Sequence, residues 1–213
     1  MHNSTDQQRR PGRPPVTEDG ASRVQILRVA ERLFSERGYA ATSLRHIGDA
    51  AGLNPALVNY HFGNKLGLLE AVFEEALKPL ASVMQQLRKS GSASPQALLA
   101  LISELAADHP NLLPLVVREA LLPGGAMREV FAERFAPRLG GLFPLLIRGE
   151  QQREALDPQA DPEALSVLLL SMGIFPHIAA ELAARVFGLE LQEGGAERLE
   201  AQTLRLLQRG VIL

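Results

Sequence analysis

The sequence predicts an all-α protein, and three observations support this fold class. Hydrophobic residues make up 46% of the 213 residues, but aromatic residues only 5%. Few segments of strand length alternate apolar and polar residues, whereas apolar residues recur at helical spacing along most of the chain. Cap residues and Gly or Pro breaks divide this pattern into about nine or ten helices.

The composition also limits the class of protein. Cysteine is absent, which excludes disulfide bonds, thiolate metal sites and cysteine nucleophiles. No uninterrupted apolar stretch of about 18 residues occurs, and the N-terminus is polar. We therefore expect a soluble cytoplasmic protein without a membrane partner. His109 and His177 are too isolated to indicate a metal site, and we expect no cofactor.

Charge is distributed unevenly along the chain. The net charge is −2, but residues 1–65 hold nine Lys and Arg against six Asp and Glu, whereas residues 66–213 hold thirteen against eighteen. The front is therefore mildly basic (+3) and the rear acidic (−5). This distribution fits nucleic-acid contact confined to one end of the molecule.

The N-terminal region predicts a tail followed by a helix. Residues 1–20 are polar and rich in Pro and Gly, so we expect them to be disordered. The first helix is expected from about Ser22 to Arg37, with Gly38 ending it. Its apolar stripe consists of Ile26, Leu27, Ala30, Leu33 and Phe34.

Residues 42–65 predict two short helices joined at an abrupt corner. Thr42 and Ser43 are good N-cap residues for the first of them, and Gly52 ends it. Asn54 caps the second helix, where Pro55 occupies the first position because its missing N–H is not needed there.

The second of these helices, over about 55–62, is too short to be stable alone. At about 100° per residue, Val58 and Phe62 share one face and should pack on the first helix, whereas Ala56 and Tyr60 point outward. This is the pattern of a helix-turn-helix, whose second helix enters the DNA major groove. An ordinary helical hairpin in a core is the alternative.

The remainder of the chain predicts further helices. Pro79 lies inside the first of them and should kink or break it. The helix that starts at Asp161 should break around 173–176, where Gly and Pro occur. The expected segments run from the Asn64 cap to about Lys89, from the Ser94 cap to about Asp108, from Asn111 to near Leu122, over 126–155 as two helices or one broken helix, from Asp161 to Phe187, and from Ala196 to Arg209.

The front of the chain resembles the DNA-binding domain of the TetR family of bacterial transcriptional regulators. The resemblance runs from about Val24 to Phe73 and includes ILRVAERLFSERGYAATSLRHIGDAAG, the NYHFGNK box and LLEAVFEEAL. It implies a three-helix helix-turn-helix domain over 21–65 and a helical effector-binding and dimerisation domain over 66–213. The C-terminal half resembles the family in pattern only.

The resemblance also implies which residues contact DNA. Phosphate contacts fall to Thr42, Tyr60, His61 and Lys65, and Arg45 matches a position that reaches bases or backbone. Asn54 caps the recognition helix. Sequence reading falls to Pro55, Ala56, Leu57 and Asn59, of which only Asn59 can hydrogen-bond a base. Readout should therefore lean on A·T pairs plus one contact between Arg45 and a guanine. Many relatives carry an aromatic residue where this chain has Asn59.

The basic arm before the domain has two interpretations. Arg9, Arg10 and Arg13 could follow the DNA backbone or enter an A·T-rich minor groove. A solvated tail is the alternative.

The resemblance further implies a homodimer and a repressor that a small hydrophobic effector releases from its operator. The apolar 165–187 stretch and the last helix, with Leu199, Leu204 and Leu207, are the expected dimer surface, unless they pack only within the monomer. For each candidate effector residue, plain core packing is the alternative. These candidates are Met84, Leu87, Leu105, Phe131, Phe135, Phe143, Met172, Phe175 and His177.

Two other functions stay open at this point. A ligand-independent dimeric DNA-binding protein would use its rear domain only for dimerisation. An all-α enzyme is disfavoured because no H-E-x-x-H, P-loop, dinucleotide-binding or nucleophile-elbow motif occurs.

Overall fold

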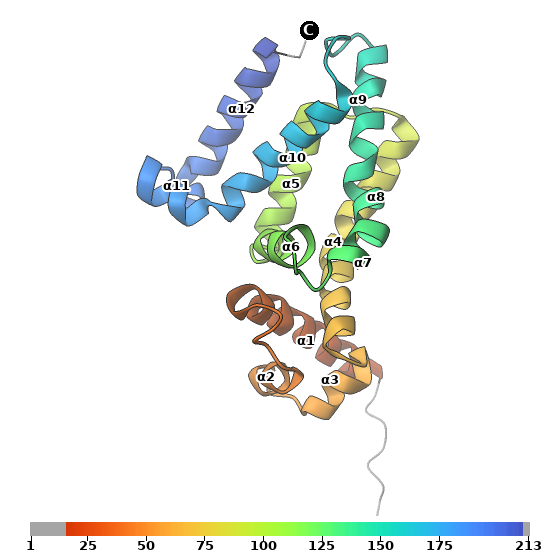
Figure 1. Cartoon of the computed structure of the whole chain (residues 1–213), viewed down its shortest axis with the longest axis vertical. Coiled ribbons are helices and arrows are strands. Elements are labelled where there is room, and N and C mark those ends of the chain that lie inside the picture. Colours follow the sequence, from red (N-terminus) through yellow and green to blue (C-terminus); the bar gives the residue numbers. More distant parts are fainter. Residues whose placement is uncertain (1–15, 211–213) are drawn as a thin grey trace, which may run out of the picture.

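The computed structural model describes residues 16–210, and this part of the chain is helical without strands (Figure 1). Three helices lie together at one end of the molecule: α1 (Val16–Arg37), α2 (Leu44–Ala50) and α3 (Pro55–Phe62). The long helix α4 (Lys65–Ser90) rises from this end into the remaining helices. It is therefore the covalent and spatial link between the two parts of the fold.

The remaining helices include several short segments joined by π or 3-10 turns. If α6 is taken with η1, α7 to α9 as one interrupted helix, and η4 with α12, the described residues contain ten helices, which confirms the predicted number. The segments are α5 (Pro95–Asp108), α6 (Leu112–Val116), η1 (Val117–Leu121), α7 (Arg128–Val130), η2 (Phe131–Phe135), α8 (Ala136–Leu139), η3 (Gly140–Leu142), α9 (Phe143–Gln152), α10 (Pro162–Ile178), α11 (Ala180–Phe187), η4 (Leu191–Gly195) and α12 (Ala196–Gly210).

The predicted caps are confirmed at the starts of α3, α4, α5 and α10. The Asn54 side chain accepts the Ala56 N–H, and the Asn64 side chain accepts the Gly67 N–H at 2.8 Å. Ser94 and Asp161 cap α5 and α10 in the same way. Each side chain satisfies a backbone N–H that a helix start leaves without an intrahelical acceptor.

Two predicted boundaries are wrong. α1 begins at Val16 rather than near Ser22, and Gly20 lies inside the helix. One glycine costs a helix only about 1 kcal/mol, which the packing of a long helix offsets. Residues 16–20 therefore belong to α1 and not to the tail.

The break predicted around 173–176 lies later, at Ala179, where α10 ends and the chain turns by 77° into α11. Gly173 serves a different purpose from the predicted one. A Cβ there would lie 2.7 Å from Cδ1 of Ile102, so this glycine lets α10 approach α5 closely. Similarly, α4 continues through Pro79 without a break.

The buried core does not divide where the DNA-binding helices end. One cluster runs from Ile26 and Phe34 of α1, through Phe73 of α4, to Ile102 of α5 and Leu115 of α6. A second cluster, around Met84 and Phe143, fills the far end between α4, α5, α9, α10 and α12. The helices α5 and α6 therefore share one core with α1.

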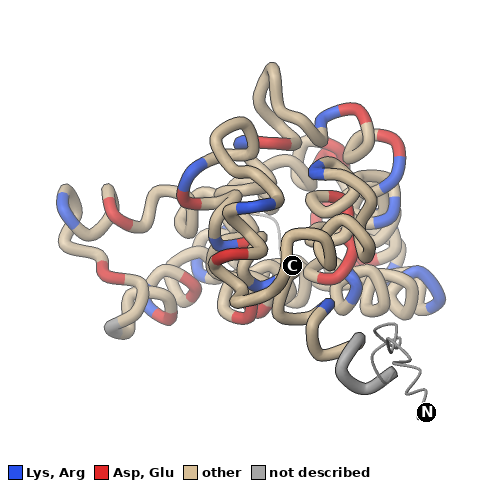
Figure 2. Tube along the Cα trace, turned by 90° about the horizontal axis from the view of Figure 1, so that it is seen from below, with Lys and Arg blue, Asp and Glu red and all other residues tan. Residues whose placement is uncertain are grey.

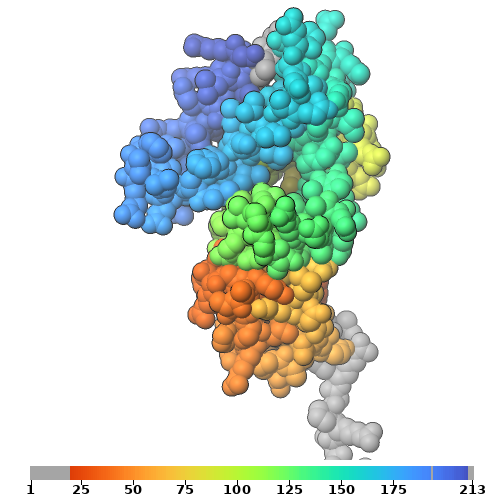
Figure 3. Space-filling model, viewed as in Figure 1, coloured from red at the N-terminus to blue at the C-terminus, as the bar shows by residue number. Residues whose placement is uncertain are grey.

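The α11 and α12 segments project from this body (Figures 1 and 3). Over residues 16–210, no single helix has both the length and the apolar character to cross a membrane, although the bent pair α10 and α11 reaches these limits when taken together.

Gly67 is expected to be essential for the junction of α3 and α4. A Cβ at this position would overlap the carbonyl oxygen of Phe62, whereas a Cβ at Gly20 meets nothing within 4 Å. Gly67→Ala should lower the free energy of unfolding by about 2 kcal/mol because backbone atoms must move. Gly20→Ala should raise it by about 0.5–1 kcal/mol. Urea unfolding of both variants measures the difference, and equal stabilities would contradict this account.

Candidate nucleic-acid interface

The α2–α3 corner is built by close packing of two short helices. Ile47 and Val58 are fully buried on facing sides of the corner, and Leu53 and Phe62 pack against the same core. A Cβ on Gly48 would lie only 3.0 Å from Cα of Pro55. Gly48 therefore permits the close approach of α2 to the start of α3, a requirement that helical spacing and cap preferences did not indicate.

The outer face of α3 carries the predicted base-reading residues. Ala56 and Asn59 are exposed, and Pro55 and Leu57 are half-buried beside them. Tyr60 is 66% exposed, although large aromatic side chains are mostly buried in proteins. An apolar and amide-bearing surface thus faces outward at the tip of the molecule, as the sequence predicted.

Asn54 and Arg45 border this face. Asn54 is exposed but uses its side-chain oxygen to accept the Ala56 N–H at 2.9 Å. It therefore fixes the start of α3, and this cap restricts how far its amide can turn toward a base. The Arg45 side chain is 83% exposed and holds a long pair of 3.8 Å with Asp49. Such an exposed pair is weak, so Arg45 can reorient toward a phosphate or base.

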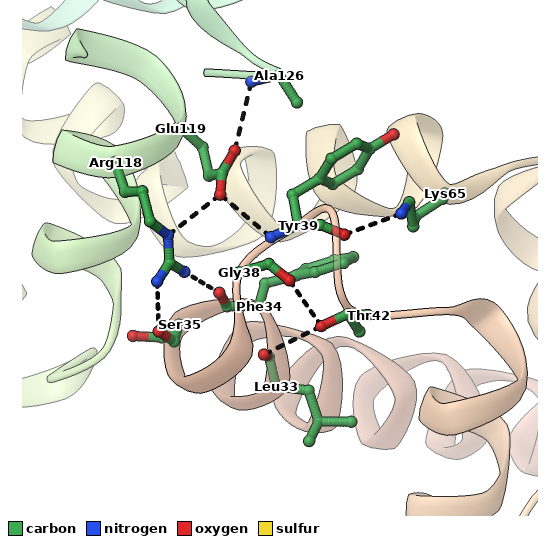
Figure 4. Close-up of polar contacts among 10 residues, drawn as sticks. All are labelled: Leu33, Phe34, Ser35, Gly38, Tyr39, Thr42, Lys65, Arg118, Glu119 and Ala126. Carbon is green, nitrogen blue, oxygen red and sulfur yellow. Dashed lines mark hydrogen bonds and ion pairs between the residues drawn. The ribbon is translucent and has the colours of Figure 1, made fainter. Parts of the chain in front are cut away.

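Thr42 is not the N-cap of α2 and does not face the outer surface, as the predicted phosphate contact would require. It is 1% exposed, and its hydroxyl donates to the carbonyl oxygens of Leu33 and Gly38, the latter at 2.8 Å (Figure 4). Ser43 is the N-cap of α2 instead, with its hydroxyl accepting the His46 N–H at 3.1 Å. A direct phosphate contact through the Thr42 side chain is incompatible with this geometry, because a buried threonine needs its hydroxyl bonded internally.

His61 faces inward rather than toward a groove. Its Nε2 atom is buried, and its ring lies 5.4 Å from the Tyr60 ring and 5.8 Å from the Phe62 ring. The predicted phosphate contact would require this imidazole to turn out from the end of α3. Its position instead suits packing between two aromatic rings.

Lys65 has an internal function in addition to the predicted one. Its ammonium donates to the carbonyl oxygen of Tyr39 at 2.9 Å and lies 4.3 Å from the centre of the Tyr39 ring (Figure 4). Lys65 remains partly exposed at the first residue of α4. It therefore fixes the α1–α2 turn to the start of α4 while its charge stays close to the surface.

The charges at this end are interspersed. Figure 2 views the molecule from below and shows basic and acidic positions alternating along the trace. Arg9, Arg10 and Arg13 lie outside the described residues, so the minor-groove interpretation of the arm stays a prediction.

The predicted effector residues do not converge on one cavity. Met84, Leu87 and Phe143 belong to the far core cluster, and Leu105 belongs to the cluster near the DNA-binding helices. Phe131 and Phe135 stack at 5.8 Å and both contact the Phe73 ring edge-on, so they fix α4 to η2. These six residues are core, which was the alternative for each.

Met172 and His177 of the predicted set line a groove, whereas Phe175 is 64% exposed on the opposite face of α10. The groove has a volume of about 640 Å³ and lies between α5, α10 and α12. Leu99, Ala106 and Leu199 contribute to its apolar wall. Burial lowers the pKa of the His177 imidazole.

The chain has recognisable relatives. Residues 26–72 match the profile described as "Bacterial regulatory proteins, tetR family". The chain is 24% identical over 193 residues to "Probable HTH-type transcriptional regulator YttP" of Bacillus subtilis, covering 88% of this chain and 92% of YttP. It is 32% identical over 94 residues to the HTH-type transcriptional repressor KstR2 of Rhodococcus jostii, covering 42% of this chain and 46% of KstR2.

Solved structures share the fold over most of the chain. The SmeT–triclosan complex aligns with a TM-score of 0.64 at 22% identity, covering 91% of this chain and 92% of SmeT. The matched profile coincides with α1 to α4, where the exposed α3 face and its supporting core lie. Residues 26–72 of the chain therefore form a helix-turn-helix domain of the tetR family of bacterial regulatory proteins, and the chain as a whole is similar to transcriptional regulators that carry this domain.

Proposed function

We propose that this protein is a homodimeric repressor that inserts α3 into the major groove of an operator and is released by a small, mainly apolar effector. The exposed outer face of α3 is the observation that carries this proposal. Residues 21–65 serve DNA binding in this view, and residues 66–213 serve effector binding and dimerisation, with α4 shared in packing between them.

The proposed contacts divide into two kinds. Ser43, Tyr60 and Lys65 lie near helix ends around α3, and in this proposal they contact phosphates, which position the protein without reading sequence. Asn59 is an exposed amide on α3 that can pair with an adenine, and Ala56 and Leu57 offer apolar contact to thymine methyls. Readout therefore favours A·T pairs, with Arg45 supplying one further base or backbone contact.

Asn59→Ala and Tyr60→Phe should separate these two kinds of contact. Asn59→Ala removes a bidentate base contact and should weaken operator binding about tenfold while leaving random DNA unaffected. Tyr60→Phe removes only a hydroxyl and should weaken operator and random DNA by the same, smaller factor. Fluorescence anisotropy with a selected operator and a scrambled duplex measures both. Equal losses on both duplexes for Asn59→Ala would contradict base reading by this residue.

An apolar surface supports dimerisation. Val167, Leu168 and Phe175 lie exposed on one face of α10, and Leu182 and Val186 continue this surface on α11. Exposed apolar patches of this extent usually mark contact surfaces. A symmetric dimer would cover the surface and present two α3 helices to two half-sites. Of the residues predicted for this interface, Leu165 and Leu207 are buried within the monomer instead.

Phe175→Glu should disrupt the dimer. A carboxylate at the centre of the apolar face would be buried without a partner, so the protein should sediment as a monomer. Loss of the second half-site should weaken operator binding about a hundredfold or more. Leu121→Glu is the control, because Leu121 is an exposed leucine at the end of η1 and belongs to neither α10 nor α11. A dimeric Phe175→Glu variant in sedimentation velocity would refute this interface.

The groove between α5, α10 and α12 is the proposed effector site. Its volume suits a small organic molecule. Glu197 and Glu200 lie on its α12 side, and no Lys or Arg is among its described lining residues. These carboxylates favour a neutral or cationic apolar effector over an anionic one. The ligand complex of the structurally similar SmeT supports a ligand-responsive function.

Filling the groove should abolish the response to effector. Ala107 lines the groove and is exposed, so Ala107→Trp occupies it without overpacking the core. A compound at 100 times its dissociation constant should stabilise the wild type by about 2.7 kcal/mol in thermal unfolding, and this shift should vanish in the variant. Ala201→Trp, on an exposed position of α12 outside the groove, is the matched control.

Two outcomes would redirect the proposal. If Ala107→Trp keeps the thermal shift, the effector binds elsewhere. If no compound class stabilises the wild type and operator binding is undiminished throughout, the ligand-independent alternative is correct.

A further inference from the structure

Glu119 is a buried carboxylate that joins the helical domain to the turn before α2. It lies in η1, is 7% exposed, and receives three N–H groups on its side-chain oxygens (Figure 4). The donors are the Tyr39 backbone N–H at 3.1 Å, the Arg118 Nε–H at 3.1 Å and the Ala126 backbone N–H at 3.3 Å. A buried carboxylate is costly unless it is bonded in this way, so its position is strongly constrained.

On one side, Glu119 fixes the turn that leads into α2. Tyr39 donates its N–H to Glu119 and accepts the Lys65 ammonium with its carbonyl oxygen. Its carbonyl oxygen also receives the Thr42 N–H at 3.3 Å. The same turn therefore touches the start of α4 at Lys65 and passes directly into Ser43 at the start of α2.

Arg118 fixes the end of α1 from the same segment. Its guanidinium donates to the carbonyl oxygen of Ser35 at 2.9 Å and to that of Phe34. Carbonyl groups in the last turn of a helix favour a cation because most of them lack intrahelical partners, although the Phe34 carbonyl also accepts the Gly38 N–H at 3.0 Å. The neighbouring residues Arg118 and Glu119 thus hold both the end of α1 and the turn that follows it.

On the other side, Glu119 fixes the loop after η1. The Ala126 N–H bonds its side chain and the Met127 N–H bonds its carbonyl oxygen at 2.8 Å. A Cβ on Gly125 would overlap the Glu119 backbone, so the loop closes tightly on this residue. The loop continues into η2, whose Phe131 and Phe135 pack on Phe73 of α4.

We propose that Glu119 is a positioning residue for DNA binding. It acts through Tyr39 to set the separation between Ser43 and Lys65, so that both meet phosphates of one groove. If the loop at 122–127 shifts, the carboxylate must release either Ala126 or Tyr39, and the separation changes with it. This inference rests on the proposed operator binding, and it assigns the connection between the helical domain and the DNA contacts to one side chain.

A partly buried ion pair that only stabilises the fold is the competing explanation. It predicts that substitution lowers stability while the folded variant binds DNA as the wild type does. Positioning predicts in addition a change in the number of phosphates that the protein neutralises. The salt dependence of the binding constant measures that number, because its logarithmic slope decreases by about 0.9 for each phosphate that is no longer neutralised.

The test compares three variants with the wild type on a selected operator between low and moderate salt. Glu119→Ala removes every side-chain acceptor, and we expect operator affinity to fall about tenfold with a salt slope reduced by about 0.9 or more. Glu119→Gln keeps one acceptor oxygen for Tyr39 and should recover most of both losses. Arg134→Gln breaks exposed pairs between η2 and Glu70 and Glu74, and it should leave affinity and slope unchanged.

The outcomes separate the inference from the function on which it rests. A folded Glu119→Ala protein with wild-type affinity and salt slope overturns the positioning role. If Glu119→Ala does not fold, Gly125→Ala replaces it, because that substitution displaces the loop while retaining the carboxylate. An unchanged slope in Gly125→Ala also overturns the role.

Amide hydrogen exchange tests the contacts of Glu119 with Tyr39 and Ala126 in the absence of DNA. In the wild type, the Tyr39 and Ala126 amides should be protected together, and in Glu119→Gln the Ala126 amide should exchange faster while Tyr39 stays protected. If both amides stay protected in Glu119→Gln, the result contradicts a carboxylate shared by Tyr39 and Ala126. Failure of the wild type to bind any selected duplex refutes the proposed function. The exchange experiment does not depend on DNA, so it still tests the contacts of Glu119 in that case.

Discussion

The shortness of α3 is the constraint on which the rest of the structure depends. A helix of eight residues does not form stably by itself, yet a recognition surface must hold its side chains in fixed positions. The structure meets this need with a capped and proline-started first turn and with Val58 fully buried in a core shared by α1, α2 and α4. The apolar inner face of α3 is therefore fixed, which leaves its outer face free for partners.

Because that core continues from α1 and α4 into α5 and α6, the helices after α4 are packed together with the first three. The ring cluster of Phe73, Phe131 and Phe135 fixes α4 to η2, and Arg118 and Glu119 fix η1 to the end of α1. Apolar packing resists separation of these parts but tolerates small displacement. The buried hydrogen bonds tolerate little displacement, since an unsatisfied buried group costs about 1–3 kcal/mol. Apolar packing thus holds α4 against η2, and the hydrogen bonds of Arg118 and Glu119 fix the position of η1 relative to the end of α1.

Exposed and buried charges have different consequences in this structure. Exposed pairs such as Arg45 with Asp49 contribute little to stability and leave Arg45 available. In the pair formed by Arg118 and Glu119, the carboxylate is buried and the guanidinium is partly covered, and both are bonded to backbone groups as well as to each other. Net charge alone therefore gave a weak indication of function, whereas the location of individual charges separates exposed side chains from those bonded within the fold.

Local chemistry in the sequence determined the helical fold, the caps at Asn54, Asn64 and Ser94, and the outward face of α3. These follow from interactions between residues a few positions apart, which periodicity and cap preferences indicate directly. The family resemblance of the front of the chain rests on the same stretch.

Only the tertiary structure decided which polar groups face inward. Thr42 has the residue type of a phosphate contact, but it is buried and donates its hydroxyl to the Gly38 carbonyl oxygen, whereas Lys65 bonds the Tyr39 carbonyl oxygen and stays partly exposed. Glu119 carries no local signal, because its partner Tyr39 is 80 residues away in the chain. Contacts between distant segments depend on how the helices pack, and a single sequence does not specify that packing through spacing or composition.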